Sequence, residues 1–123
     1  MKEMRGHHSC LSLNNEIFVA GGLYKKTTEI FNLQTRTWRS GPNLPEIKYF
    51  QLVKAQTSSQ YAAFLIGGSG WNESFGGRWI ELSVVYALPR NYKSFIKIGD
   101  LKTARKNHVA MVLSDELVEK CVD

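Results

Sequence analysis

Two copies of a short apolar run that ends in adjacent glycines constrain what this chain can fold into. Residues 16–22 read Glu-Ile-Phe-Val-Ala-Gly-Gly, and residues 61–68 read Tyr-Ala-Ala-Phe-Leu-Ile-Gly-Gly. Each run has the length of a strand and is bounded by turn-forming residues. A glycine pair after a strand suits a backbone that turns sharply or takes positive φ. Because Gly22 and Gly68 lie 46 positions apart, the pattern indicates a repeat architecture.

The residues that begin each repeat also recur. Arg5 precedes His8 by three positions, and Arg105 precedes His108 by the same interval. In the middle copy, Lys48 takes the place of the arginine and a polar residue follows three positions later. Equivalent positions in a repeat favour a structural role, such as hydrogen bonding at a junction between repeats, over general-base catalysis.

A third set of recurring residues lies after the glycine pairs. Trp38 and Phe95 each precede a leucine by six positions. Residues 29–32, Glu-Ile-Phe-Asn, lie before the first of these aromatics, and residues 84–87, Val-Val-Tyr-Ala, lie before the second. Recurring residues therefore occur before, within and after the glycine-paired runs, and they span most of each repeat.

Together these features resemble the kelch repeat. The resemblance covers nearly the whole chain and is strongest in the first repeat. It weakens in the second, where Phe95 replaces tryptophan and Ala87 replaces the amide, and in the third Cys121 stands near the place of a glycine pair. Membership would imply a β-propeller with one four-stranded antiparallel blade per repeat. The residues expected to carry the structural motif are Gly21, Gly22, Trp38, Gly67, Gly68, Phe95, Arg5, His8, Arg105 and His108.

The resemblance implies an all-β fold, a kelch-type β-propeller fragment of about two four-stranded antiparallel blades plus an extra inner strand. We expect a first blade over 1–43, a second blade with a long loop insertion over 44–100, and the start of a third, truncated blade over 101–123. Closure of a propeller needs roughly 4–8 blades. The chain is therefore expected to be part of a longer propeller, completed by further repeats or by oligomerisation.

Strands within the blades are predicted from apolar runs between turn signals. Trp38 is expected to pack between blades. The residues 69–78 are predicted to form the inserted loop, and 56–60 an extended turn. The expected strands are 9–13, 17–20, 27–32 and 37–39 in the first blade, 61–66, 79–86 and 93–98 in the second, and 108–113 in the third.

Composition fits a globular protein without a membrane span or a cysteine framework. Apolar residues make up 43% and charged residues 22%, and the net charge is +5. The N-terminus lacks the apolar core of a signal peptide, so a cytoplasmic or nuclear location is expected, or a secreted one had a leader been lost. Cys10 and Cys121 are predicted to be reduced thiols, with Cys10 packed like a small hydrophobe. A zinc site built from Cys10, His7, His8 and His108 is disfavoured, because no metal-ligand spacing occurs.

No catalytic motif is present, so the chain is not expected to be an enzyme and no cofactor or metal is predicted. There is no Gly-x-Ser-x-Gly elbow and no phosphate loop. The glycine-rich segment 67–70 follows a strand but precedes no helix that could present its N-terminus to phosphate. Recognition of a partner remains as the expected function.

The loops between the second and third strands of each blade are the expected recognition surface, because insertions in repeat proteins often lie on the binding face. Aromatic and arginine side chains there suit a binding hot spot, and lysines favour an acidic partner. The expected partner is a protein or peptide of acidic character. A structural alternative for Trp71 is packing onto Phe75 within the loop. The candidate partner-binding residues are Tyr24, Lys25, Lys26, Trp71, Asn72 and Arg78.

Two other functions stay open at this point. Similar repeats carry oxidases, so the chain could be a fragment of a galactose-oxidase-like propeller enzyme, although no Tyr, His and Cys ligand set can be placed. It could also be a truncated product without activity. Nucleic-acid binding is not expected, because the basic residues form no stripe.

Overall fold

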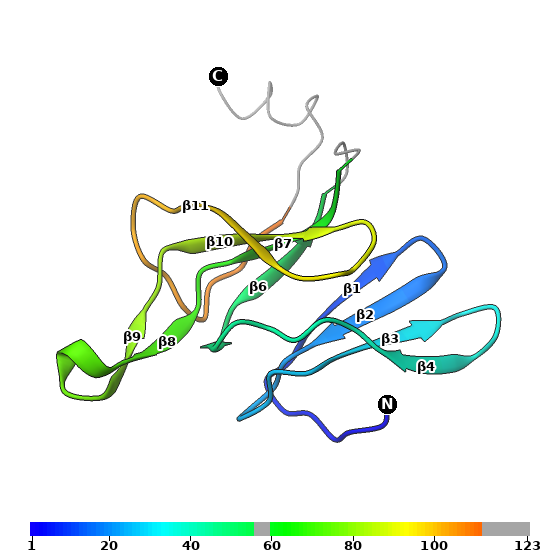
Figure 1. Cartoon of the computed structure of the whole chain (residues 1–123), viewed down its shortest axis with the longest axis horizontal. Helices are drawn as coiled ribbons and strands as arrows, with labels where there is room; N and C mark the ends of the chain where they lie inside the picture. Colours follow the sequence, from blue (N-terminus) through cyan, green and yellow to red (C-terminus); the bar gives the residue numbers. More distant parts are fainter. Residues whose placement is uncertain (56–59, 112–123) are drawn as a thin grey trace.

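Two four-stranded antiparallel sheets form the body of the molecule (Figure 1). The computed structural model describes residues 1–55 and 60–111. The first sheet has the order β1 (Ser9–Leu13), β2 (Glu16–Ala20), β3 (Thr28–Asn32) and β4 (Thr37–Ser40). The second sheet has the order β11 (Ile96–Asp100), β10 (Val84–Pro89), β7 (Tyr61–Ile66) and β6 (Gln51–Lys54). The all-β expectation is confirmed, and the two sheets lie within residues 1–43 and 44–100.

The segment expected to be an inserted loop is largely a hairpin. Its strands β8 (Ser69–Asn72) and β9 (Arg78–Glu81) are joined by the 3-10 helix η1 (Glu73–Phe75), and β5 (Ile47–Lys48) pairs with β8 to give a three-stranded sheet. The expected third strand over 79–86 is therefore wrong. β9 ends at Glu81 and β10 begins at Val84. In the segment between these strands, the Leu82 N–H donates to the Gly68 carbonyl at 2.8 Å, which interrupts the run.

Pro89 is the last residue of β10. The pairing of β10 with β7 shifts register between Leu88 and Pro89. Proline lacks a donor for a regular ladder and is tolerated where such an irregularity interrupts the pairing.

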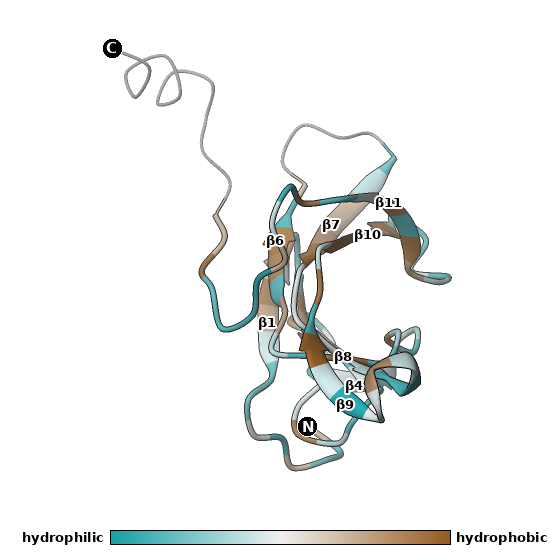
Figure 2. Ribbon diagram, turned by 90° about the vertical axis from the view of Figure 1, so that its left-hand side faces the viewer, coloured by the Kyte–Doolittle hydropathy of each residue, from teal (hydrophilic) through white to brown (hydrophobic). Residues whose placement is uncertain are grey.

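One hydrophobic core joins the two sheets. The strands β1 and β6 lie beside each other, and the apolar runs of β2 and β7 have no exposed residue and bury consecutive ones. Figure 2 shows hydrophobic colouring in β6 and β10 and hydrophilic colouring along many connections. Burial of both faces explains why these runs do not alternate between polar and apolar residues. The buried cluster contains Leu13, Phe18, Ala20, Ile30, Leu44, Ile47, Phe50, Leu52, Ala62, Ala63, Leu65 and Leu88.

The two glycine pairs have the same backbone geometry. The φ angles are 70° and 125° at Gly21 and Gly22, and 62° and 112° at Gly67 and Gly68. A Cβ on Gly67 would lie 2.6 Å from the Arg105 carbonyl oxygen, so this close approach needs glycine. The two glycine pairs that recur in the sequence are thus structurally equivalent.

Each repeat begins with one non-glycine residue at positive φ. These residues are His7, Tyr49 and Asn107, with φ of 53°, 56° and 51°. The residue after each is equivalent, so Phe50 and not Gln51 occupies the place of His108. Both pack on a glycine, Phe50 against Gly21 and His108 against Gly67.

Two expectations about the remaining segments are not met. Residues 108–111 form no strand, and the rest of the expected inner strand, with Cys121, lies outside the described residues. Most of the turn over 56–60 also lies outside them.

Cys10 was expected to pack like a small hydrophobe, but it is exposed. Alternation along β1 turns its side chain away from the core, into which Leu13 points.

Within the described ranges, no helix is long and apolar enough to span a bilayer. The same part of the chain brings together no group of three His, Cys, Asp or Glu side chains that could hold a metal ion. The residues weighed for zinc are therefore not gathered into a site there.

Candidate recognition surface

A hollow of about 190 Å³ lies where three separate segments meet, and we name it the loop-end pocket. One wall comes from the connection between β2 and β3, another from the linker between the sheets and β5, and the third from β9. Three of the six residues predicted for partner binding line it. The lining residues are Tyr24, Lys25, Lys26, Glu46, Ile47, Lys48 and Trp79.

Lys48 lies between two aromatic rings of this pocket. Its Nζ is 4.2 Å from the Tyr24 ring centroid and 4.0 Å from the Trp79 ring centroid. Both distances are well within the range of cation–π attraction. Tyr24 is 87% exposed and has a φ of 62°, which is uncommon for an aromatic residue.

The other three predicted residues lie on the β8–β9 hairpin beside the pocket. The Trp71 ring meets the Trp79 ring edge-on at 5.9 Å, and its Nε1 donates to Glu73 Oε1 at 2.7 Å. Asn72 pairs with Arg78 across the hairpin. Arg78 stacks over Phe75 at 5.6 Å, so the packing of Trp71 on Phe75 weighed from sequence is replaced by packing on Trp79.

Trp79 is the residue of this surface that sequence reasoning missed. It was expected as the first residue of a strand over 79–86, whereas it faces Trp71 across a hairpin and also covers Lys48. Two tryptophans eight positions apart, with glycines between them, were the available sign of a hairpin with a cross-strand aromatic pair.

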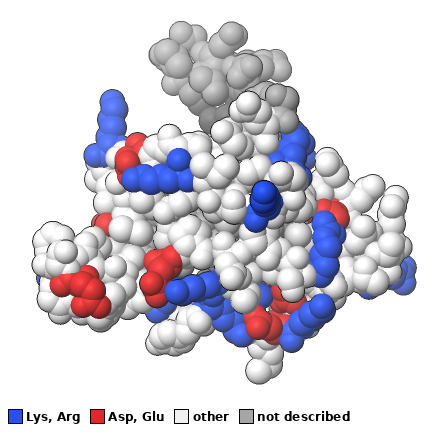
Figure 3. Space-filling view, in the orientation of Figure 1, with Lys and Arg blue, Asp and Glu red and all other residues white. Residues whose placement is uncertain are grey.

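Acidic side chains neutralise two of the three lysines. Lys25 Nζ lies 3.4 Å from Glu3, and Lys26 Nζ lies 3.2 Å from Glu46. The Thr27 hydroxyl and Lys25 hold the pKa of the Glu3 carboxyl below its ordinary value. Figure 3 accordingly shows acidic and basic atoms side by side on the face it presents, with no continuous basic patch.

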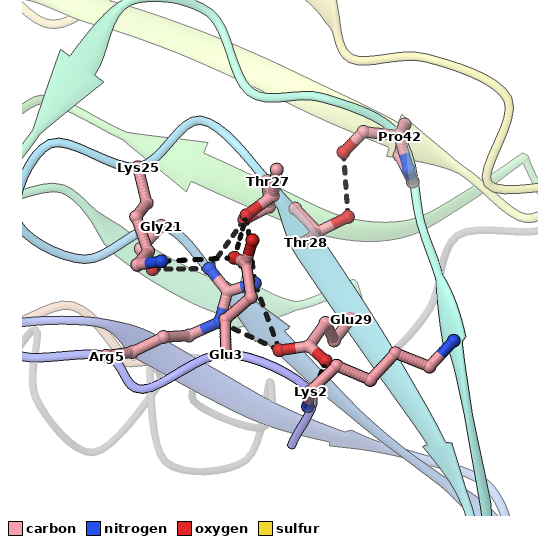
Figure 4. Close-up of polar contacts among 9 residues, drawn as sticks. All are labelled: Lys2, Glu3, Arg5, Gly21, Lys25, Thr27, Thr28, Glu29 and Pro42. Carbon is pink, nitrogen blue, oxygen red and sulfur yellow. Dashed lines mark hydrogen bonds and ion pairs between the residues drawn. The ribbon is translucent and has the colours of Figure 1, made fainter.

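Arg5 is a structural centre of the first sheet (Figure 4). Its fully buried side chain donates to the Gly21 and Thr27 carbonyls at 2.7 and 2.9 Å and forms ion pairs with Glu3 and Glu29. Burial opposes ionisation of Glu29. Hydrogen bonds from the Lys2 backbone N–H and from Arg5 outweigh it and hold the pKa of Glu29 below its ordinary value.

Arg105 and the repeat histidines differ from this pattern. Arg105 is exposed and acts through its backbone, accepting from the Gly68 N–H at 2.7 Å and donating to the Leu82 carbonyl at 3.0 Å. His8 is exposed. His108 packs on Gly67, but neither ring nitrogen has a hydrogen-bond partner among the described residues.

Trp38 does not pack between the blades as expected. Trp38 packs on Phe31 of its own sheet, with ring centroids 4.9 Å apart. Phe95, in contrast, meets Phe18 of the other sheet edge-on at 6.3 Å. Packing between the sheets is therefore made by the phenylalanine, where Trp38 was expected to make it.

Comparison with known proteins identifies the repeat. Residues 4–45 match the family model of the Kelch motif. The chain carries a kelch repeat. The solved structure titled "Structure of YjhT" superposes on the kelch chain with a TM-score of 0.74 and 15% identity, covering 89% of this chain and 32% of that one. The kelch chain thus spans about a third of the length of that protein.

The motif and the superposition together establish a kelch propeller fold with two successive blades, β1–β4 and β6, β7, β10 and β11. At this level of identity the superposition shows the fold alone. The comparison with curated protein sequences found no match.

Proposed function

We propose that the chain is a non-catalytic protein-interaction module that binds a protein or peptide through the loop-end pocket and the adjacent β8–β9 hairpin. One observation carries the proposal: the connection between β2 and β3 and the β8–β9 hairpin place three exposed aromatic rings on one surface, two of them in contact with Lys48. Tyr24, Trp71 and Trp79 are 87%, 47% and 38% exposed. Exposed aromatic side chains beside charged ones are typical of binding hot spots.

The hairpin gives this surface a rigid support. Ladder pairing places Trp71 directly opposite Trp79, and the Glu73 carboxylate fixes the indole of Trp71. A fixed aromatic surface loses little conformational entropy when a partner binds. This supports binding by the hairpin side chains and not by a loop that must first become ordered.

Selection of displayed 12-residue peptides on the purified chain tests the proposal. The binding of each selected peptide to Trp71→Ala is measured by fluorescence anisotropy, with Ile98→Ala as a control at an exposed apolar side chain of β11. We expect Trp71→Ala to weaken binding more than about tenfold at an unchanged melting temperature, because a hot-spot side chain is lost. Equal binding by wild type and Trp71→Ala, or unfolding of Trp71→Ala, would contradict the proposal.

A further inference from the structure

Lys48 lies beside the position in the second blade that Arg5 occupies in the first. Arg5 comes two residues before the residue of positive φ in its repeat, and Ile47 is the residue at that distance in the second repeat. A Cβ on Gly22 would accordingly meet the Arg5 side chain, and a Cβ on Gly68 would meet the Ile47 side chain. Lys48 follows directly, so the second blade has an apolar side chain at the Arg5 position and its basic side chain one residue later.

The second blade lacks the buried carboxylate that neutralises Arg5 in the first. Glu29 lies opposite Val19, which comes two residues before the first glycine pair. Tyr86 lies opposite Leu65, which comes two residues before the second pair. Because the phenol of Tyr86 replaces the carboxylate and Ile47 replaces Arg5, the second blade has no equivalent of the buried Arg5–Glu29 ion pair.

The Lys48 side chain turns instead into the loop-end pocket. There Tyr24 and Trp79 hold its Nζ between their rings at 4.2 and 4.0 Å. Tyr24 is kept over the lysine by a left-handed backbone, a conformation that costs of the order of 1–3 kcal/mol for a residue other than glycine. The ammonium group is thus positioned before any partner arrives.

Lys48 also differs from the other lysines of the pocket. Lys25 and Lys26 are each within ion-pair distance of a glutamate. No carboxylate of residues 1–55 and 60–111 lies within that distance of Lys48. The pocket therefore contains one preorganised cation whose charge the described chain leaves unpaired.

We propose that Lys48 binds an acidic side chain of the bound peptide. Its ammonium group binds the carboxylate of one aspartate or glutamate, and the rings of Tyr24 and Trp79 pack against the methylenes of that residue. The hollow of about 190 Å³ is smaller than the roughly 300 Å³ at which small-molecule sites begin, so it suits a single side chain. The inference rests on the proposed function and specifies the partner that the surface takes.

A carboxylate fits this pocket better than a phosphate. Phosphopeptides are typically bound by clusters of arginines, whose planar groups contact two phosphate oxygens at once. The basic residues of the described lining are all lysines, and one of the three lies outside ion-pair distance of a carboxylate. A single point charge between aromatic rings matches a singly charged acid.

The test uses the peptides selected on the wild-type chain and four derivatives of the protein. The peptides are resynthesised with each Asp or Glu changed to Asn or Gln, and with phosphoserine in its place. Binding is measured by anisotropy for Lys48→Met, Lys48→Arg, Trp71→Ala and the control Lys97→Met. Lys97 is a half-exposed lysine of β11 outside the pocket. Thermal melting shows whether each variant is folded.

We expect Lys48→Met to weaken binding by about 10- to 100-fold, as for loss of a charge-assisted hydrogen bond. Lys48→Arg and Lys97→Met should keep most of the affinity. Changing one Asp or Glu of the peptide to Asn or Gln should weaken its binding to the wild type. The same change should not weaken its binding to Lys48→Met any further, because that variant has already lost the ammonium group. Peptides that need Trp71 but bind Lys48→Met normally would overturn this inference and leave the proposed function standing. A stronger response to phosphoserine than to Asp or Glu would also overturn it, whereas peptides insensitive to Trp71 would overturn both.

Discussion

Arg5 and Lys48 are basic residues at the start of successive repeats, and they lie in opposite environments. In the first blade the guanidinium is fully buried, with two carboxylates and two carbonyls around it. In the second blade the ammonium group lies among exposed aromatic rings. Arginine suits the first environment because its planar fork satisfies several acceptors at once, and lysine suits the second because it is a compact charge.

Replacement of Arg5 should therefore destabilise the protein strongly. Arg5→Met leaves Glu29 buried without its cation, and we expect a loss of about 3–5 kcal/mol in the free energy of unfolding. Arg39→Met is the matched control. It breaks an ion pair with Glu16 at a half-exposed site and should cost at most about 1 kcal/mol. Urea unfolding followed by tryptophan fluorescence measures both, and equal losses would contradict a central role for Arg5.

At the scale of the element, the sequence indicated strands wherever burial alone specifies them. The strands β1, β2, β3 and β7 were predicted within one residue, because apolar runs between turn residues mark them. The hairpin β8–β9 was not predicted. Its strands contain no continuous apolar run, and what forms the hairpin is the pairing of Trp71 with Trp79, which is a contact between strands. Composition along the chain carries little information on such a contact.

The glycine pair is the element-scale feature that the sequence did reveal, and it should tolerate no side chain. Gly67→Ala places a Cβ 2.6 Å from the Arg105 carbonyl in a left-handed backbone, and we expect a loss of at least about 2 kcal/mol. Gly99→Ala in β11 is the control, because no atom lies within 4 Å of its Cβ position. Thermal unfolding compares the two, and a Gly67→Ala protein as stable as Gly99→Ala would show that the backbone can relax.

At the scale of the whole molecule, the two blades form one unit through their shared core. Phe18 of β2 is fully buried and meets Tyr92 and Phe95 of the second blade, at 5.9 and 6.3 Å between ring centroids. Sequence reasoning recognised the blades and could not foresee which aromatic joins them. Which aromatic side chain packs between the blades depends on the angle between the two sheets and on the size of the ring that fits in the space between them.

Removal of Phe18 should therefore affect both blades. We expect Phe18→Ala to lower the free energy of unfolding by about 3–5 kcal/mol, since a fully buried aromatic leaves a cavity. Hydrogen exchange should accelerate in β10 as well as in β3. Leu33→Ala, at a half-exposed turn position, is the control and should change little. Faster exchange confined to the first blade would show that the blades unfold independently.

The left-handed residues at the start of each repeat have a consequence for how such a chain diversifies. His7, Tyr49 and Asn107 share a φ near 50° yet have three unrelated side chains. The path of the chain from one blade to the next is thus encoded in a dihedral angle and two glycines, and the neighbouring side chains are left to mutate. A repeat built on this plan can change the side chains at the start of each blade by point substitution while the spacing of its blades stays the same.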